Sequence, residues 1–212
     1  MHSKTMKERR ERQAPHRYKN TMAKVKAKAG ININRASVSL RENHKVLWIT
    51  ITAMFMAINI VLATLGIPVP GGHLYLCDAI ICTAALLLDP LAAFAVGGIG
   101  SFLGDFIFYP APMFVSLVVH GLQAVVISLI VRGGKGEKPR FVRALTAVLI
   151  GAVIMVVGYT LGKIYVYSTY EYAMMKLPYE IAQALLGVVL SLLLCYRFKL
   201  FAIFNRETKR EQ

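Results

Sequence analysis

Long apolar stretches dominate the chain from residue 46 to residue 196, whereas residues 1–45 are polar and basic. A transmembrane helix needs about 20 consecutive, mostly apolar residues. On this scale the pattern predicts six membrane-spanning helices, at residues 46–65, 76–88, 91–108, 113–131, 142–165 and 178–195. The second stretch is short, so it must borrow residues from the preceding loop or be buried by its neighbours.

Asp89 and Pro90 separate the second apolar stretch from the third. A single helix over residues 78–108 would be about 46 Å long, which exceeds the roughly 30 Å hydrocarbon core of a bilayer. Asp is favoured just before a helix, and Pro is favoured at the first helical position, where no hydrogen bond is lost. We therefore predict a tight hairpin at these two residues.

The positions of the positive charges predict how the helices are oriented. Of 25 Lys and Arg residues, 13 precede residue 46, five lie within residues 132–143 and five follow residue 196; only Lys163 and Lys176 remain. With six spans and both termini inside, those 23 residues are cytoplasmic, whereas five spans would place the last two groups outside. The positive-inside rule favours six spans. We therefore predict an all-α integral membrane protein, a six-transmembrane-helix bundle with its N-terminus and C-terminus in the cytoplasm.

The same pattern divides the chain into a basic N-terminal extension (1–45), a membrane domain (46–196) and a basic tail (197–212). The extension has few apolar residues and is not expected to fold alone. Attraction to anionic cytoplasmic lipids explains the charge of both ends better than nucleic acid does, so no nucleic-acid partner is expected. A misassigned start codon, with Met22 as an internal start, is the other explanation of the extension.

Motifs for catalysis or metal binding are not found in the sequence. It contains no H-E-x-x-H, G-x-S-x-G or P-loop, and no His pair at metal spacing. Cys77, Cys82 and Cys195 are spaced for neither a disulfide framework nor a metal site. We therefore expect no enzyme activity, no cofactor, no metal and no ATPase within this chain.

Ionisable and amide side chains at membrane depth are candidates for function, because burying them there is costly. They are Asp78, Asp105, His120, Gln123, Glu180 and Gln183. His120 shares a helical face with Gln123, as Glu180 does with Gln183. The structural alternatives are that Asp78 caps a helix, that Asp105 pairs within the bundle and that His120 is a satisfied core residue.

Eight of the ten tyrosines, Tyr109 and Tyr172 among them, fall in or near the predicted outer half. An interfacial aromatic belt explains some of them, but the predicted cytoplasmic ends have few aromatic residues. Aromatic faces beside a few fixed polar groups suit a pocket for a flat heterocycle. We predict an outward-facing pocket that includes some of these tyrosines.

Small residues recur four apart in three predicted helices. The pairs are Ala53 and Ala57, Gly100 and Gly104 (with Gly97 on nearly the same face), and Gly158 and Gly162. Such residues allow helices to pack closely in lipid. For the glycines we favour packing within the bundle. For the alanines, internal packing and a groove for another protein's helix are both open.

Several features follow one another in a fixed order along the chain. They are an Asp at the start of helix two (Asp78), a Gly-rich helix three that ends in G-x-x-x-G-D at Asp105, a Pro-containing loop before helix four and Leu-Pro ahead of a polar helix six (Pro178). In these features, and above all from residue 66 to residue 133, the chain resembles the S components of energy-coupling factor (ECF) transporters. The resemblance is to the riboflavin-transporter-like group in particular, which includes hydroxymethylpyrimidine-type proteins. The likeness covers about residues 45–197 and rests on the order and spacing of these features.

The resemblance implies a substrate-capture subunit of an ECF-type transporter in the plasma membrane of a bacterium. Its partners would be a transmembrane coupling subunit, which Ala53 and Ala57 would face, and two cytoplasmic ATPase subunits. A vitamin or vitamin precursor would bind near the outer helix ends, where the candidate residues are Asp78, Asp105, Tyr109, His120, Gln123, Tyr172, Glu180 and Gln183.

Several ligands fit this resemblance: hydroxymethylpyrimidine or thiamine-like precursors, riboflavin, cobalamin and queuosine precursors. A stand-alone secondary transporter of a small heterocyclic solute is the alternative function. A membrane assembly protein without a ligand is a third.

Overall fold

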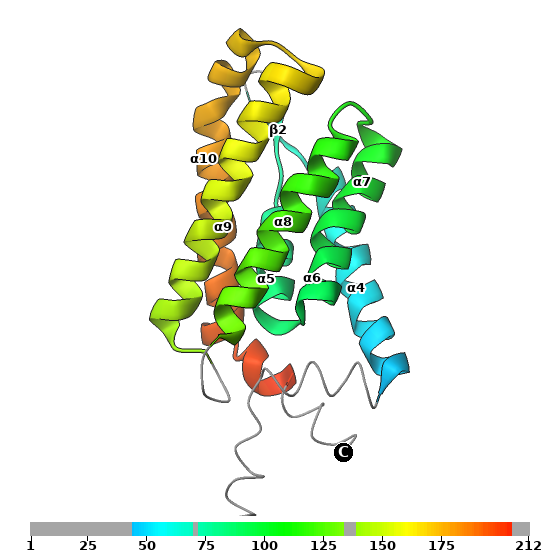
Figure 1. Ribbon diagram of the computed structural model, residues 1–212, viewed down its shortest axis with the longest axis vertical. Helices are drawn as coiled ribbons and strands as arrows, with labels where there is room; N and C mark the ends of the chain where they lie inside the picture. Colours follow the sequence, from blue (N-terminus) through cyan, green and yellow to red (C-terminus); the bar gives the residue numbers. More distant parts are fainter. Residues whose placement is uncertain (1–43, 70–71, 134–138, 205–212) are drawn as a thin grey trace, which may run out of the picture.

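Five apolar helical segments are long enough to cross a membrane in the part of the chain that the computed structural model describes, residues 44–69, 72–133 and 139–204 (Figure 1). They are α4 (Lys45–Thr64), Pro90–Phe108, α8 (Met113–Arg132), Phe141–Tyr167 and Tyr170–Arg197. A sixth, shorter apolar helix is α5 (Cys77–Leu87). The predicted helical membrane bundle is confirmed. The number of crossings and the sides of the termini stay predictions, and the predicted extension and basic tail lie largely outside the described residues.

Three of the long segments contain a single π-helical turn. Pro90–Phe108 consists of α6 (Pro90–Phe94), η1 (Ala95–Ile99) and α7 (Gly100–Phe108). Phe141–Tyr167 consists of α9 (Phe141–Gly162) and η2 (Lys163–Tyr167). Tyr170–Arg197 consists of α10 (Tyr170–Leu192) and η3 (Leu193–Arg197). At η1 the carbonyl of Val96 accepts a hydrogen bond of 2.8 Å from Asn59 of α4.

Helix α5 is too short to cross a bilayer alone, and its neighbours bury it along nearly its whole length. It packs between α4, α8 and α10, and its apolar side chains, such as Ile81 and Leu86, are fully buried. This matches the expectation that the short apolar stretch is covered by the rest of the bundle. Residues at the start of α5 therefore lie deep in the protein.

The predicted hairpin after α5 is confirmed at Asp89 and Pro90. The Asp89 carboxylate accepts a 3.1 Å hydrogen bond from the backbone N–H of Ala92, and Pro90 takes the first helical position of α6. Trp48 of α4 donates a second 3.1 Å bond to the same carboxylate. The turn thus also ties α4 to the bundle.

The last long helix begins earlier than predicted. We expected it to start at Pro178, but α10 begins at Tyr170 and contains Pro178. Thr169 supplies the N-cap by accepting a 3.3 Å hydrogen bond from the N–H of Tyr172. A proline inside a membrane helix is tolerated because packing neighbours compensate for the lost backbone bond. The start at Pro178 was therefore wrong, and Glu180 lies ten residues inside the helix instead of beside a loop.

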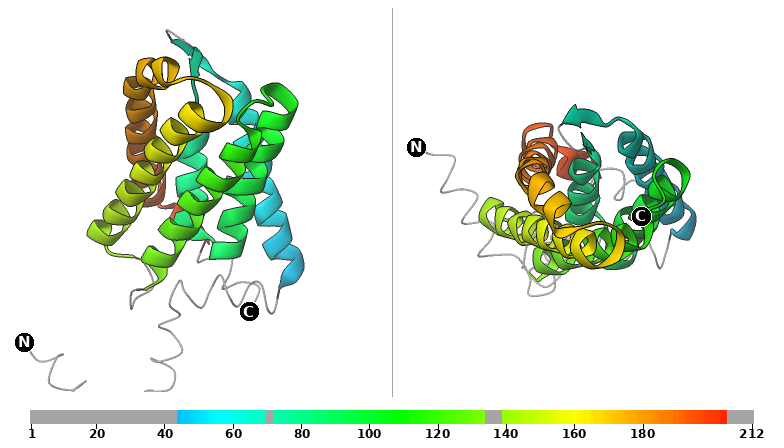
Figure 2. Two further views of the ribbon diagram at one scale, coloured as in Figure 1. Left: turned by 45° about the horizontal axis from the view of Figure 1, so that its top comes forward. Right: turned by 90° about the horizontal axis from the view of Figure 1, so that it is seen from above.

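A short antiparallel β-hairpin joins α4 to α5. Strand β1 (Ile67–Val69) pairs with β2 (Gly72–Leu74), with Ile67 opposite Leu74 and Pro68 opposite His73. We expected a loop in this segment, although its Pro-Gly-Gly run is a turn signal. The hairpin lies at the same end of the bundle as the α7–α8 and η2–α10 connections (Figures 1 and 2). We call this the hairpin end, and the opposite end, where α5 meets α6, the basal end.

The glycines of the third predicted span serve close packing, as expected. A Cβ on Gly97 would lie 2.7 Å from the backbone oxygen of His120 in α8, and one on Gly100 would lie 2.9 Å from Nδ2 of Asn59 in α4. Both distances are shorter than real contacts allow. These glycines thus let η1 approach α8 and let the start of α7 approach α4.

Candidate functional site

Asp78 is the centre of a buried polar network that joins three helices. Its side chain is 1% exposed, and its carboxylate accepts hydrogen bonds from Gln123 of α8 (3.2 Å) and Gln183 of α10 (2.7 Å). Gln183 in turn accepts a 2.9 Å bond from the backbone N–H of Tyr75, just before α5. The start of α5 is therefore fastened to α8 and α10 through side-chain amides.

His120 extends this network along α8. Its Nδ1 lies 2.8 Å from Oε1 of Gln123 and 3.8 Å from Oδ1 of Asp78. Because the Gln123 amide nitrogen donates to Asp78, its oxygen must face His120, and Nδ1 of the imidazole carries the hydrogen that is donated to it. Among the described residues, no donor is bonded to the other ring nitrogen. Nε2 is thus not used by the hydrogen bonds of the described residues.

A second polar group lies beside His120. The Ser116 hydroxyl of α8 donates to the carboxylate of Asp105 in α7, and it is also within hydrogen-bond distance of the Tyr159 hydroxyl in α9. The rings of Tyr159 and His120 are 5.1 Å apart between centroids, at a tilt of 58°. Tyr159 therefore connects the Asp105 group to the network around Asp78.

Two lysines at the hairpin end are buried. Lys163, the first residue of η2, forms an ion pair with Glu180 of α10, and its ammonium group lies 5.2 Å from the centre of the Tyr159 ring. Lys176 donates a 3.1 Å hydrogen bond to the backbone oxygen of His73, which attaches β2 to α10. The second carboxylate oxygen of Glu180 is buried without a hydrogen-bond partner among the described residues. This oxygen is an available acceptor.

Tyr75 lies between the buried polar groups and the tyrosines at the hairpin end, because it interacts with both. Burial raises the pKa of Tyr75, and the nearby charge of Asp105 and the neighbouring phenols of Tyr109 and Tyr172 raise it further. Tyr109 is exposed at the end of α7, and Tyr172 is half-buried in the first turn of α10. The two predicted tyrosines therefore lie close to Tyr75.

The candidates predicted from the sequence fall into three neighbouring groups. Asp78, His120, Gln123 and Gln183 form one network; Asp105 and Glu180 belong to the two groups that meet at Tyr159; Tyr109 and Tyr172 lie near Tyr75. Whether these residues bind a ligand stays a prediction.

Ser116 and Lys163 are not among the predicted site residues. A serine in an apolar helix carries no signal of its own, because it often bonds to its own backbone. Lys163 does carry one, since a cation within a membrane span is rare and is usually paired. The predicted six-span topology places Lys163 on the outer side, so this signal was not used.

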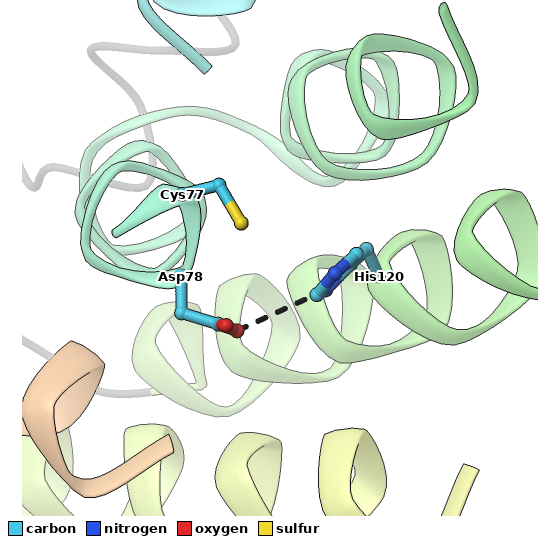
Figure 3. A group of neighbouring side chains, drawn as sticks. All are labelled: Cys77, Asp78 and His120. Atoms are coloured by element: carbon cyan, nitrogen blue, oxygen red, sulfur yellow. Dashed lines mark ion pairs between the residues drawn. The ribbon is translucent and has the colours of Figure 1, made fainter. Parts of the chain in front are cut away.

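Three side chains with metal-binding atoms also converge in this network: Cys77, Asp78 and His120 (Figure 3). One ligand atom from each lies within 4.8 Å of the others, and all three residues are buried. No spacing in the sequence pointed to this set, because Cys77 and His120 are 43 positions apart and meet only through the packing of α5 on α8.

Ala53 and Ala57 differ from the residues of this network because they are not buried. Both are exposed on α4, whose buried face consists of Thr52, Phe55 and Asn59. Packing within this chain therefore does not account for the two alanines.

Two comparisons with known proteins found similar sequences. The family model described as "ECF-type riboflavin transporter, S component" matches residues 43–199, well over half of the chain. A protein of Pyrococcus woesei, described as "Uncharacterized protein in gap 3'region", is 29% identical over 135 residues, which cover 64% of this chain and 88% of the relative.

Proposed function

This chain belongs to the S-component family of ECF-type riboflavin transporters, and from that premise we propose that its substrate binds at the hairpin end, on the network around Asp78. It is the substrate-capture subunit of an ECF transporter for a vitamin-like substrate, and it is a multi-pass membrane protein that works with the ECF energising module. It is not an enzyme. The proposals below concern its site, its orientation and its contacts.

The buried carboxylate of Asp78 carries the proposal of a binding site. A charged side chain in a membrane bundle is costly, and for that reason it usually marks a functional site. Here the side-chain amides of two other helices donate hydrogen bonds to it. Aromatic rings of Tyr75 and Tyr159 and the free oxygen of Glu180 lie in the same end of the bundle. Such a set suits a flat heterocycle with several hydrogen-bonding atoms. We infer direct contact for Asp78, Asp105, Tyr109, His120, Gln123, Tyr172, Glu180 and Gln183.

The described charges support an orientation with the hairpin end outside. Six cations lie at the basal end, and two, Lys163 and Lys176, lie at the hairpin end. The basal cations are Lys45, Arg132, Arg140, Arg143, Arg197 and Lys199. Cytoplasmic loops carry the excess of positive charge. We therefore propose six spans with both termini in the cytoplasm of a bacterial cell, in its plasma membrane, with the basic ends near anionic lipids and no nucleic-acid partner.

The binding proposal is tested on the purified chain alone. Native mass spectrometry identifies any small molecule that co-purifies, and calorimetry then gives its affinity. We expect Gln183→Leu, which removes a bond to Asp78 and leaves that carboxylate less satisfied, to weaken ligand binding roughly 10–100-fold. Thr52→Val, which removes a buried hydroxyl on α4 outside the network, is the control and should change the affinity less than about 2-fold. Equal affinities for both variants would refute the location of the site.

The face of α4 with Ala53 and Ala57 is proposed to contact the transmembrane coupling subunit, which acts with two cytoplasmic ATPase subunits. Small exposed residues on a membrane helix allow another helix to approach closely. We expect Ala57→Trp to retain ligand binding but to reduce uptake by the assembled transporter by about 10-fold or more. Val153→Trp, at an exposed position of α9, is the matched control. If Ala57→Trp unfolds the chain instead, the alanines serve internal packing.

A further inference from the structure

We propose that Cys77, Asp78 and His120 form a binding site for a divalent transition-metal ion of the Zn²⁺ or Co²⁺ kind. The three residues offer a sulfur, an oxygen and a nitrogen atom that lie within 4.8 Å of one another. Two come from the start of α5 and one from the middle of α8, and their side chains point toward one another (Figure 3). The donor atoms of a tetrahedral site lie roughly 3.3–3.8 Å apart, which is the separation that a bound ion would impose on these three atoms.

Among the described residues, the buried carboxylate of Asp78 has no lysine or arginine as its partner. Its hydrogen bonds come from the neutral amides of Gln123 and Gln183. Nδ1 of His120 is 3.8 Å away and directs its hydrogen to Gln123. Glu180, in contrast, has the ammonium group of Lys163 as its partner. A carboxylate without a positive partner is costly in a low-dielectric interior.

A divalent ion balances this charge. On binding, the Cys77 thiol gives up its proton to solvent and becomes a thiolate, so that the thiolate and the Asp78 carboxylate together neutralise the two positive charges. The resulting site is neutral, which suits its depth in the bundle. A monovalent cation would leave the thiol as a poor ligand.

The surroundings of His120 are those of a metal-binding histidine. Such residues donate one ring N–H to a carbonyl or carboxylate oxygen and bind the metal with the other nitrogen. Nδ1 of His120 donates to the Gln123 carbonyl, which leaves a lone pair on Nε2. Gln123 also donates to Asp78 and, at 3.6 Å, to Cys82, so its own orientation is held from three sides.

The mixture of donors selects the class of metal. Thiolate and imidazole ligands favour Zn²⁺, Co²⁺ and similar ions, whereas Mg²⁺ and Ca²⁺ require oxygen ligands. Three protein ligands leave a fourth position open. In one respect this inference rests on the proposed function: a nitrogen or oxygen atom of the substrate would complete the coordination.

The test is a Co²⁺ titration of the full chain, purified in detergent and freed of metal with a chelator. We expect one equivalent to bind with visible bands of a tetrahedral ion and a thiolate-to-cobalt charge-transfer band in the near ultraviolet. Cys77→Ser should lose the charge-transfer band and bind Co²⁺ at least 100-fold more weakly. Cys195→Ser, a buried cysteine in η3 at the basal end, is the matched control and should behave as the wild type.

The outcomes separate this inference from the proposed function. Absence of stoichiometric Co²⁺ binding, or a charge-transfer band that persists in Cys77→Ser, would overturn the metal site. His120→Gln gives an independent check should Cys77→Ser fail to fold, because it should retain the thiolate band but shift the visible bands. The co-purifying molecule, and riboflavin as a defined probe, are measured on the same samples with and without metal. Vitamin binding without metal binding would leave the proposed function standing and reject the metal.

Discussion

Asp78 and Asp89 lie at opposite ends of the buried helix α5, and each is 1% exposed, but their surroundings differ. Asp89 bonds to a backbone N–H three residues ahead and to the indole of Trp48, and the charge of Arg132 is close enough to interact with it. Asp78 instead receives side-chain amides from two distant helices. The Asp89 carboxylate stabilises a local turn, whereas the Asp78 carboxylate accepts hydrogen bonds from two other helices of the bundle.

The difference shows how to separate structural from functional acids in a membrane bundle. A capping carboxylate is explained by the backbone that it satisfies, and a nearby cation balances its charge. Asp78 has neither explanation, since its hydrogen bonds come from side-chain amides and the start of α5 does not depend on it for a cap. The free-energy cost of burying the Asp78 carboxylate is therefore a stronger indication of a role in binding than the burial of Asp89.

The largest effect is expected from Asp78→Asn. Loss of the charge should weaken binding of the co-purified ligand roughly 10–100-fold, because hydrogen bonds to a charged group are the stronger ones. Calorimetry on the isolated chain measures this change. Asp89→Asn, which is equally buried, is the control and should keep the affinity within about 3-fold. Similar losses in both variants would mean that the two acids are equivalent.

Asp89→Ala should affect stability instead of binding. It removes the cap of α6 and the bond from Trp48 and leaves Arg132 without its acidic neighbour, so we expect the free energy of unfolding to fall by about 1–3 kcal/mol. Thermal unfolding in detergent, followed by circular dichroism, reports the loss. Unchanged stability would show that the turn at Pro90 holds without the cap.

The smallest effect belongs to Trp48→Phe. This change keeps an aromatic ring on α4 but removes the donor to Asp89, and it should lower the free energy of unfolding by about 0.5–1.5 kcal/mol. A double-mutant cycle with Asp89→Ala isolates the bond, since the two losses should not add. Strict additivity would show that indole and carboxylate contribute independently.

The sequence predicted the parts of the fold that depend on local chemistry. Apolar length located the helices, and the Asp89-Pro90 pair located the hairpin, because cap and proline act within one turn. The prediction at Pro178 was wrong for the opposite reason. Whether a proline starts a helix or lies inside it depends on the packing around it and, here, on the cap at Thr169, nine residues earlier. The β-hairpin was missed because its turn signal lies in a segment that was treated only as a connection.

The candidate site was predicted as a set of residues but not as an arrangement. Single polar residues in apolar helices, such as Asp78 and Gln183, could be identified from the sequence, because the free energy that it costs to bury a polar side chain is a property of the residue itself. Their pairing spans 105 positions and depends on how α10 packs against α5. The same holds for Cys77, which looks like a small core residue until His120 is placed beside it.

The position of α4 separates two tasks in this protein. None of the side chains bonded to Asp78 comes from α4, which is fastened to the bundle by Asn59 at η1 and by Trp48 at the basal turn. The helix that carries the exposed alanines packs against α5, but its hydrogen bonds to the bundle are separate from those of the proposed binding site. A partner docked on α4 would therefore load the bonds of Asn59 and Trp48 before it loads a hydrogen bond of Asp78.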